Sequence, residues 1–222
     1  MELKFFKKSV PMLAIMAVFS VIMIYAIHTL LTPEKKLPVF NPADVNPKLV
    51  DQSVKHIRRN HRVSEFSLIN QNGDTITQED YNDKIYVADF FFTRCMTICP
   101  IMTNNMGKIQ EAFKNDDSIM FLSHSVTPGI DSVSVLRDYA DKKGVIDRKW
   151  NITTGNKKHI YELARKSYFA VLEDGDGGIQ DFIHTENFIL VDKKRRIRGF
   201  YDGTNNEDME RLILDIKLLQ NE

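Results

Sequence analysis

The sequence predicts an α/β sandwich built around a mixed β-sheet and preceded by one membrane-spanning helix. Two observations lead to this prediction. Residues 10–31 contain no charged side chain, and from about residue 63 onward apolar runs of strand length alternate with segments whose apolar residues repeat at helical spacing. At 222 residues the chain is long enough for one domain of ordinary size with additional segments, so we expect a single folded domain.

The first element is an anchor at residues 10–31, VPMLAIMAVFSVIMIYAIHTLL. At about 1.5 Å per residue this helix would cover a hydrocarbon core of about 30 Å. A cleaved signal peptide is the alternative, but its apolar region is usually shorter, and no A-x-A-like site is seen here. Because Lys4, Lys7 and Lys8 precede the span, the positive-inside rule places residues 1–9 in the cytoplasm. The chain would then cross the bacterial inner membrane once, with its C-terminal domain on the periplasmic side.

Residues 32–62 are predicted to form a semi-extended tether between the membrane and the folded domain. They contain four prolines and no sustained apolar period, and proline restricts both its own backbone and that of the residue before it. A basic cluster near the end of the tether could touch anionic headgroups, although a solvated tether end is the favoured interpretation. The cluster consists of His56, Arg58, Arg59, His61 and Arg62.

The folded domain is expected over residues 63–222, and it begins with a hairpin. In EFSLINQNGDTIT, Phe66 and Leu68 alternate on one face. Asn72 and Gly73 then supply a turn signal, because both residues tolerate positive φ. The dense apolar run KIYVADFFFT follows, and it suits a central strand that is covered on both faces.

A helix is predicted from Pro100 onward, because its apolar residues form one stripe and proline is favourable in the first helical turn. The next buried strand is IMFLSHSV, followed by a short helix around Leu136, and WNITTG is another strand. The segment NKKHIYELARKSYF is predicted to be a helix with Asn156 as its N-cap. The apolar stripe of the first of these helices consists of Met102, Met106, Ile109 and Phe113.

The domain closes with a hairpin, NFILVDKKRRIRGFYDG, and a helix with one apolar face. Two motifs in this region are discounted. DGDGG at residues 174–178 resembles a calcium loop but lacks the glycine and the ligand at the required places, so a loop is expected. KKRRIR at residues 193–198 straddles a hairpin, and basic and acidic residues balance at 30 each, so no nucleic-acid partner is expected. The apolar face of the last helix consists of Met209, Leu212, Ile213, Ile216 and Leu219.

Both cysteines of the chain lie in DFFFTRCMTICPIM, where the central strand is followed by a helix. The N-terminus of a helix carries partial positive charge and Arg94 adds a cation, so the thiol pKa should fall there. With three residues between them, Cys95 and Cys99 lie about one helical turn apart and can aim at one point. Two soft thiolates that converge on a point suit a soft metal such as Cu(I) or Zn(II).

A third ligand would make this site less open, and six histidines are available. His184 and His124 both stand at the end of a predicted strand, where a side chain could face a neighbouring site. Position alone does not choose between them, and a hydrogen-bonded structural role is an equally good interpretation of either one.

FFFTRCMTICPIM, taken together with SHSVTPGIDSVSVLRDYA, WNITTGNKKHIYELAR, HTENFILVD and RIRGFYDG, resembles the Sco/SenC family. These are copper-binding, thioredoxin-like proteins that help to assemble the copper centre of cytochrome c oxidase. The resemblance covers residues 63–203 and includes the layout of anchor and tether. It implies a thioredoxin-like three-layer α/β/α sandwich with an added N-terminal hairpin. It also implies a copper site formed by Cys95, Cys99 and His184, which would hold Cu(I), with Cu(II) as a further state.

The chain departs from the family pattern at two places. Met96 and Thr97 stand where the family often has Pro-Asp, and the stretch 127–131, TPGID, keeps only the second acidic residue of Asp-Pro-x-x-Asp. The missing acidic groups bear on partner docking and thiol chemistry more than on the metal ligands. The partners implied by the resemblance are the copper-bearing subunit of cytochrome c oxidase or another copper acceptor, and a thiol reductant.

We therefore expect a membrane-anchored copper chaperone that delivers copper during assembly of the oxidase. The alternative is a thiol–disulfide oxidoreductase that reduces cysteines of the oxidase subunit or of another exported protein, with Cys95 and Cys99 as its catalytic pair. It is less favoured, because redox motifs normally have two residues between the cysteines. A peroxiredoxin-like activity, suggested by Thr93, lacks its usual upstream proline. A structural disulfide would close so small a loop that it would stabilise the fold little.

Overall fold

A computed structural model describes residues 2–31, 36–171, 178 and 181–222, and the chain divides into two compact units, Met1–Lys36 and Leu37–Glu222. Residues 32–35 of the expected tether and residues 174–177 of the expected loop lie outside the described residues.

The first unit consists of helix α1 (Glu2–Leu31). Its segment Val10–Ile27 has a mean hydropathy of 2.5, and among the described residues α1 is the one helix long and apolar enough to cross a membrane. The anchor expected at residues 10–31 therefore coincides with a continuous helix.

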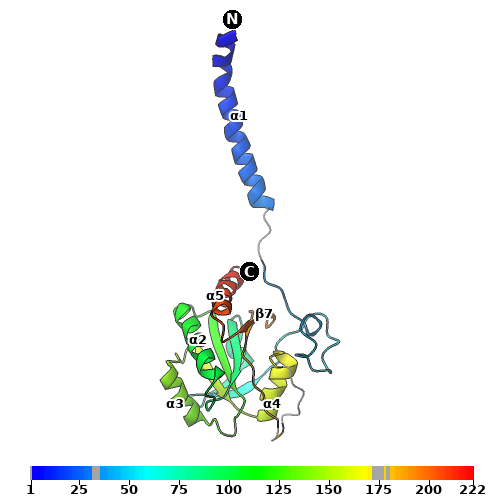
Figure 1. Ribbon diagram of the computed structural model, residues 1–222, viewed down its shortest axis with the longest axis vertical. Helices are drawn as coiled ribbons and strands as arrows, with labels where there is room; N and C mark the ends of the chain where they lie inside the picture. The colour runs from blue at the N-terminus through cyan, green and yellow to red at the C-terminus, as the bar shows by residue number, and fades with distance from the viewer. Residues whose placement is uncertain (1, 32–35, 172–177, 179–180) are drawn as a thin grey trace. The chain divides into compact units, whose positions relative to one another are not determined.

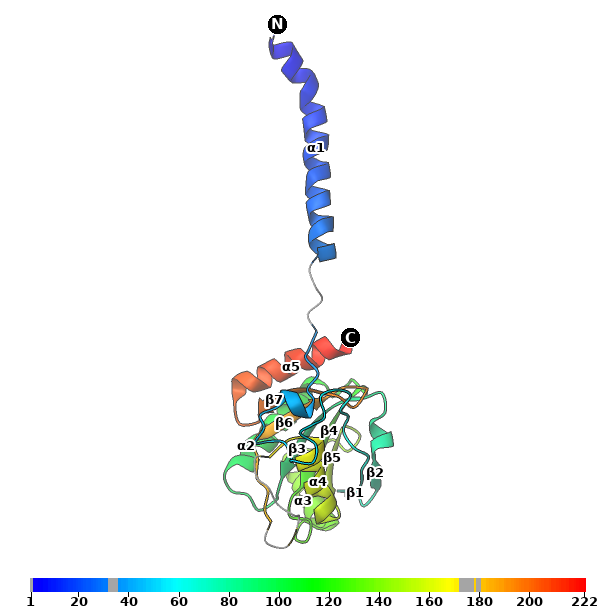
Figure 2. The ribbon, with the colours of Figure 1, turned by 90° about the vertical axis from the view of Figure 1, so that its right-hand side faces the viewer.

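The second unit is a seven-stranded mixed sheet with helices on both faces (Figures 1 and 2). The strand order across the sheet is β2-β1-β5-β4-β3-β6-β7. The strands are β1 (Ser67–Asn70), β2 (Thr75–Thr77), β3 (Ile85–Phe91), β4 (Ile119–Ser125), β5 (Trp150–Thr154), β6 (Asn187–Val191) and β7 (Ile197–Asp202). The helices are η1 (Pro42–Asp44), η2 (Gln78–Tyr81), α2 (Ile98–Ala112), α3 (Val133–Lys143), α4 (Lys157–Glu162), the π-helical turn η3 (Leu163–Ser167) and α5 (Asn206–Gln220).

The centre of the sheet is parallel and its margins are antiparallel. β3 pairs with β4 and β4 with β5 in parallel, whereas β6 pairs antiparallel with both β3 and β7, and β1 pairs antiparallel with β5 and β2. In the β3–β6 ladder Tyr86 is opposite Val191, so the end of β6 lies beside the start of β3. The segment before β6 therefore lies at the same end of the sheet as the loop after β3.

Two hydrophobic cores cover the two faces of the sheet. One contains apolar residues of α2, α3 and α5, and the other contains those of α4, η3 and residues 45–66. Figure 1 shows α2 and α3 on one side of the sheet and α4 on the other. Every residue of β3 is buried, and Val87 faces the first core while Ala88 faces the second. The predicted three-layer α/β/α sandwich with a mixed sheet is confirmed.

Local signals in the sequence account for several element ends. The hairpin β1–β2 forms where it was predicted, and Gly73 occupies its turn with a φ of +85°. The side chain of Asn156 accepts a hydrogen bond from His159 N and caps α4 as predicted. Asn205 caps α5 in the same way, with bonds from the backbone N–H groups of Glu207 and Asp208.

Residues 37–62, which we call the N-terminal strap, differ from the expected tether because they pack on the domain. Val45 and Val50 are 8% and 3% exposed and belong to the core on the α4 side of the sheet. Phe40 N donates to Ile197 O over 2.9 Å and forms an isolated bridge to β7.

The buried guanidinium of Arg198 holds the beginning of the strap. It donates to Leu37 O over 2.7 Å and to Pro38 O over 2.9 Å. Its charge is balanced by Glu222 and Asp192, at 2.5 Å and 3.0 Å. These contacts join residues that are distant in the sequence, which is why the prolines and the missing apolar period suggested a free segment.

Candidate metal centre

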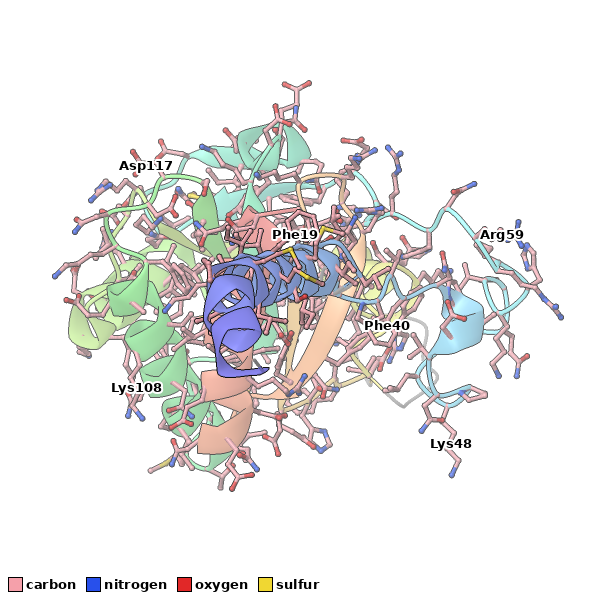
Figure 3. All side chains as sticks on the ribbon, turned by 90° about the horizontal axis from the view of Figure 1, so that it is seen from above. Phe19, Phe40, Lys48, Arg59, Lys108 and Asp117 are labelled. Atoms are coloured by element: carbon pink, nitrogen blue, oxygen red, sulfur yellow. The ribbon has the colours of Figure 1, made fainter. Side chains whose placement is uncertain are left out.

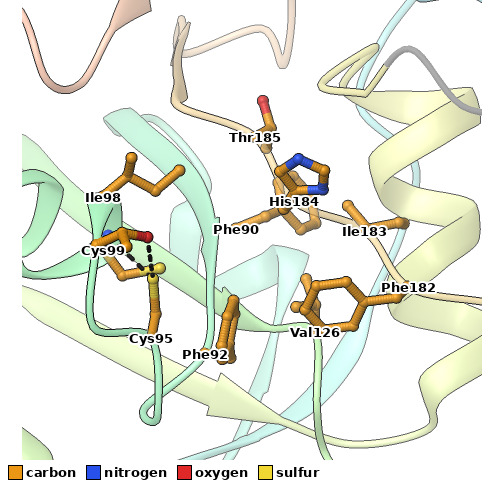
Figure 4. Close-up of a pocket in the computed structure, with 11 residues that line it drawn as sticks. Phe90, Phe92, Cys95, Ile98, Cys99, Val126, Phe182, Ile183, His184 and Thr185 are labelled. Carbon is orange, nitrogen blue, oxygen red and sulfur yellow. Dashed lines mark hydrogen bonds between the residues drawn. The ribbon is translucent and has the colours of Figure 1, made fainter.

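The two cysteines meet at the junction between β3 and α2. Cys95 lies in the loop that connects them and is partly exposed, whereas Cys99 lies in the first turn of α2 and is 3% exposed. Cys99 N donates to Cys95 Sγ over 3.4 Å, and Thr97 Oγ1 lies 3.6 Å from the same sulfur (Figure 4). The loop, rather than one turn of a helix, thus brings the two thiols together.

The two thiols differ in acidity. Burial raises the pKa of Cys95, but hydrogen bonds from Cys99 and Thr97 outweigh it and lower this pKa to about 7. Burial, together with the nearby Cys95 and Asp89, raises the pKa of Cys99 to about 12. The expected fall in thiol pKa is therefore confirmed for Cys95 and wrong for Cys99, because Cys99 is covered by the core.

The cysteine loop is fixed by a buried carboxyl group on the neighbouring loop. Asp131 is fully buried and accepts hydrogen bonds from Thr93 Oγ1 at 2.6 Å and Thr93 N at 3.3 Å. The same carboxyl group accepts from Ser125 Oγ at 2.5 Å and Thr127 Oγ1 at 3.0 Å. Since Thr93 stands two residues before Cys95, these bonds set where the loop leaves β3.

His184 comes from the irregular segment that precedes β6, and it is exposed. This segment is held at both ends. Asp181 forms a two-pronged ion pair with Arg165, at 2.6 Å and 2.7 Å, and Thr185 Oγ1 donates to Ala170 O over 2.7 Å. The backbone around His184 is thereby kept against the layer formed by α4 and η3.

Cys95, Cys99 and His184 line one cavity of about 290 Å³. Figure 4 shows the cysteines on one wall and His184 on the other. The rings of Phe92 and Phe182 contact each other edge to face at 5.2 Å and form part of the apolar lining. Within the described residues, no three His, Cys, Asp or Glu side chains are close enough to hold a metal ion. The structure thus brings the three predicted ligands to one cavity but leaves the imidazole across from the sulfur pair.

His124, the other candidate, is excluded by its place in the fold. It is fully buried and its ring stacks on Phe90, with centroids 5.0 Å apart. Its Nδ1 lies 3.2 Å from Thr153 Oγ1, and burial lowers its pKa to about 3. Its neighbours belong to the core on the α4 side, whereas Cys99 belongs to the core on the α2 side.

The sequence did not indicate a role at the site for three residues that shape it. Thr97 contacts the sulfur of Cys95, and Asp131 holds the loop. The third is Asp89 on β3, which is 2% exposed and accepts a hydrogen bond from Ser123 Oγ. Burial raises the pKa of Asp89 to about 7. An acidic residue inside an otherwise apolar strand was the available signal for Asp89.

A family model described as SCO1/SenC matches residues 54–219. The SCO1 protein homolog of Bacillus subtilis (strain 168) is 32% identical over 160 residues, which cover 71% of this chain and 82% of that protein. BsSco, described as a member of the Sco family of cytochrome c oxidase assembly proteins with a disulfide switch, superposes with a TM-score of 0.62 at 31% identity. The match covers 72% of this chain and 94% of BsSco.

A further structural neighbour is Bradyrhizobium japonicum ScoI, solved with copper bound. It has a TM-score of 0.57 at 21% identity and covers 71% of this chain and 99% of its own. These Sco structures share the thioredoxin-like fold that the resemblance implied, so the predicted fold class is confirmed. Because this family model matches most of the chain and the Bacillus subtilis relative is 32% identical to it, the chain belongs to the SCO1/SenC family.

Proposed function

We propose that this protein is a membrane-anchored copper chaperone that binds copper through Cys95, Cys99 and His184 and delivers it during assembly of the cytochrome c oxidase copper centre. The observation that carries this proposal is the shared cavity, in which two sulfurs and one exposed imidazole face the same solvent-accessible space. Thiolate and imidazole donors suit copper, and Cu(I) accepts such a small set of soft ligands.

The difference between the thiols suggests an order of binding. With a pKa of about 7, Cys95 is substantially ionised near neutral pH, and it is the more exposed of the two sulfurs. It therefore captures the incoming ion first. Cys99 follows, and it gives up its proton as the metal binds, because a coordinating thiol is deprotonated.

The third ligand requires a closing movement. His184 stands across the cavity from the cysteines, between the fixed points Asp181 and Thr185. Only the short stretch between these points has to shift for the imidazole to approach the sulfurs. A ligand that arrives last and leaves first opens a coordination position, which a partner that takes the copper can fill before the thiolates let go.

Location and partners complete the proposal. Helix α1 would anchor the chain in the inner membrane with the second unit in the periplasm, and the copper-bearing oxidase subunit, or another copper acceptor, would receive the ion. A thiol reductant is also needed, because the two neighbouring cysteines can close into a disulfide in an oxidising compartment.

Metal binding by the reduced full-length chain tests the ligand set. We expect Cys95→Ser and Cys99→Ser to abolish stoichiometric Cu(I) binding in competition with Zn(II). We expect His184→Ala to weaken copper affinity by at least about tenfold, because even the loss of a residue that only supports a metal ligand typically weakens metal affinity by about that much. His56→Ala is the matched control, because His56 is exposed on the strap, outside the cavity lining. Unchanged stoichiometry and affinity in all three site variants would refute the assignment.

The thiol–disulfide oxidoreductase remains the second candidate, and the unequal thiols are the observation that favours it. The Cys95 thiolate would attack a substrate disulfide, and Cys99 would resolve the mixed disulfide. This releases the two substrate thiols, leaves a Cys95–Cys99 disulfide, and requires an external thiol reductant for the next turnover. Turnover of a disulfide peptide that survives His184→Ala, without stoichiometric copper binding, would favour this enzyme over the chaperone.

A further inference from the structure

A second surface of interest lies at the end of the domain opposite the metal centre. The strap begins there, with Leu37 held by Arg198 and Glu222. The β6–β7 turn, Asp192–Arg196, lies beside it, because β6 ends opposite the start of β3. The cysteine loop follows the other end of β3, whose seven residues span about 20 Å at roughly 3.3 Å each.

Two basic segments that are far apart in the sequence meet at this end. Val63 N donates to Arg195 O over 2.8 Å, which joins the residue after the strap to the β6–β7 turn. In the described part of the chain, five exposed cations of these segments form no ion pair. They are Arg58, Arg59, Arg62, Lys193 and Lys194. We call these five residues the basic surface.

Two carboxylates beside the β6–β7 turn are already engaged with other cations. Glu65 pairs with Arg195, and Asp192 pairs with Arg196 and Arg198. Figure 3 shows Arg59 on the side of the domain opposite Lys108, which lies on α2.

The chain brings this surface close to the proposed membrane anchor. Helix α1 ends at Leu31 and the second unit begins at Leu37, so five residues connect them. However they are arranged, they span at most about 20 Å. Arg198 then fixes Leu37 and Pro38 beside the β6–β7 turn. The start of the strap therefore stays within about 20 Å of the end of α1.

We propose that the basic surface docks on the anionic lipid headgroups of the membrane that α1 crosses. This rests on the anchor in the proposed function. Anionic headgroups complement the unpaired cations, and each cation near such a surface strengthens docking roughly fivefold. The domain then stands with its cysteine loop turned away from the bilayer, because that loop lies at the far end of β3.

Lysine footprinting of the full chain in nanodiscs tests the proposal. Trace labelling with acetic anhydride would compare phosphatidylcholine discs with discs that also contain phosphatidylglycerol. We expect labelling of Lys193 and Lys194 to slow at least about fivefold on the anionic discs. It should recover in about 1 M salt, where the Debye length falls to about 3 Å. Lys158 is the internal control, because it is exposed and begins α4 at the metal-centre end of the sheet.

A pair of variants shows whether the two segments act as one surface. Arg58→Glu with Arg59→Glu should restore fast labelling of Lys193 and Lys194 on anionic discs, since loss of two cations weakens docking by roughly 25-fold. Lys108→Glu with Lys142→Glu, which changes the charge equally on α2 and α3, should leave their protection intact.

The outcomes separate the two proposals. A chain that inserts into neither type of disc would refute the anchor, and docking with it. A chain that inserts into both types of disc, while Lys193 and Lys194 are labelled equally fast on both, would refute docking alone. Protection by soluble polyglutamate but not by anionic discs would assign the surface to an acidic protein, and would also overturn the proposal.

Discussion

Replacing Asp131 by alanine tests how strongly one buried carboxyl group shapes the cysteine loop. Four hydrogen bonds converge on it, from Thr93 Oγ1, Thr93 N, Ser125 Oγ and Thr127 Oγ1. A buried donor that loses its acceptor costs about 1–3 kcal/mol. Ser125 is buried, whereas Thr93 and Thr127 are half-buried and can bond to water, so Asp131→Ala should lower the free energy of unfolding by about 2–4 kcal/mol.

Asp131→Asn should cost less than Asp131→Ala, because one amide oxygen can still accept a hydrogen bond. The matched control is Asp138→Ala, since Asp138 is exposed on α3 and should change stability by no more than about 0.5 kcal/mol. Urea denaturation followed by the fluorescence of Trp150 measures the effect. This residue is the single tryptophan of the chain and is 1% exposed.

A second readout separates support of the loop from support of the fold. The low pKa of Cys95 depends on hydrogen bonds from Cys99 and Thr97, which require the loop to keep its shape. Asp131→Ala should therefore move the pH midpoint of Cys95 alkylation from about 7 toward the ordinary thiol value of about 8.5. A stability within about 1 kcal/mol of the unmodified chain, or an unmoved midpoint in the folded variant, would refute the reasoning.

Two other predictions follow from the same site. Iodoacetamide should modify Cys95 with a midpoint near pH 7. In the folded Cys95→Ser variant, Cys99 should stay unmodified below about pH 9, because the burial that raises its pKa remains. Peptide mass spectrometry measures both rates, and fast modification of Cys99 would contradict its burial. Burial raises the pKa of Asp89 from 3.8 to about 7, so its contribution to stability is complete below pH 4 and is lost as the pH rises to 7. Asp89→Asn should accordingly stabilise the domain at pH 8 by up to about 4 kcal/mol, with little change at pH 4. Equal urea midpoints of the variant and the unmodified chain at pH 8 would show that the charged form of Asp89 does not destabilise the fold.

The elements near the site could be predicted from sequence because their signals are local. The turn at Gly73 and the cap at Asn156 act within a few residues, and the apolar run of β3 is long enough to indicate a strand covered on both faces. The cysteine pair was found for the same reason, since a short loop and the first turn of a helix hold both residues.

The remaining features depend on contacts between distant parts of the chain. Arg198 bonds to Leu37 and Pro38, which lie about 160 residues earlier in the sequence, and no local pattern in the strap predicts these contacts. The choice between His184 and His124 required knowing that His184 lines the cavity with the cysteines, whereas His124 is fully buried. The raised pKa of Cys99 likewise arises from burial, which spacing alone does not reveal.

The grip of Arg198 on the beginning of the strap has a mechanical consequence. In the proposed membrane-anchored protein, a pull on helix α1 would enter the second unit at Leu37 and Pro38. Arg198 passes that load to β7, the outermost strand, which is separated from β3 by β6. Such a force would therefore act first at the edge of the sheet, two strands away from β3, the strand that the cysteine loop follows.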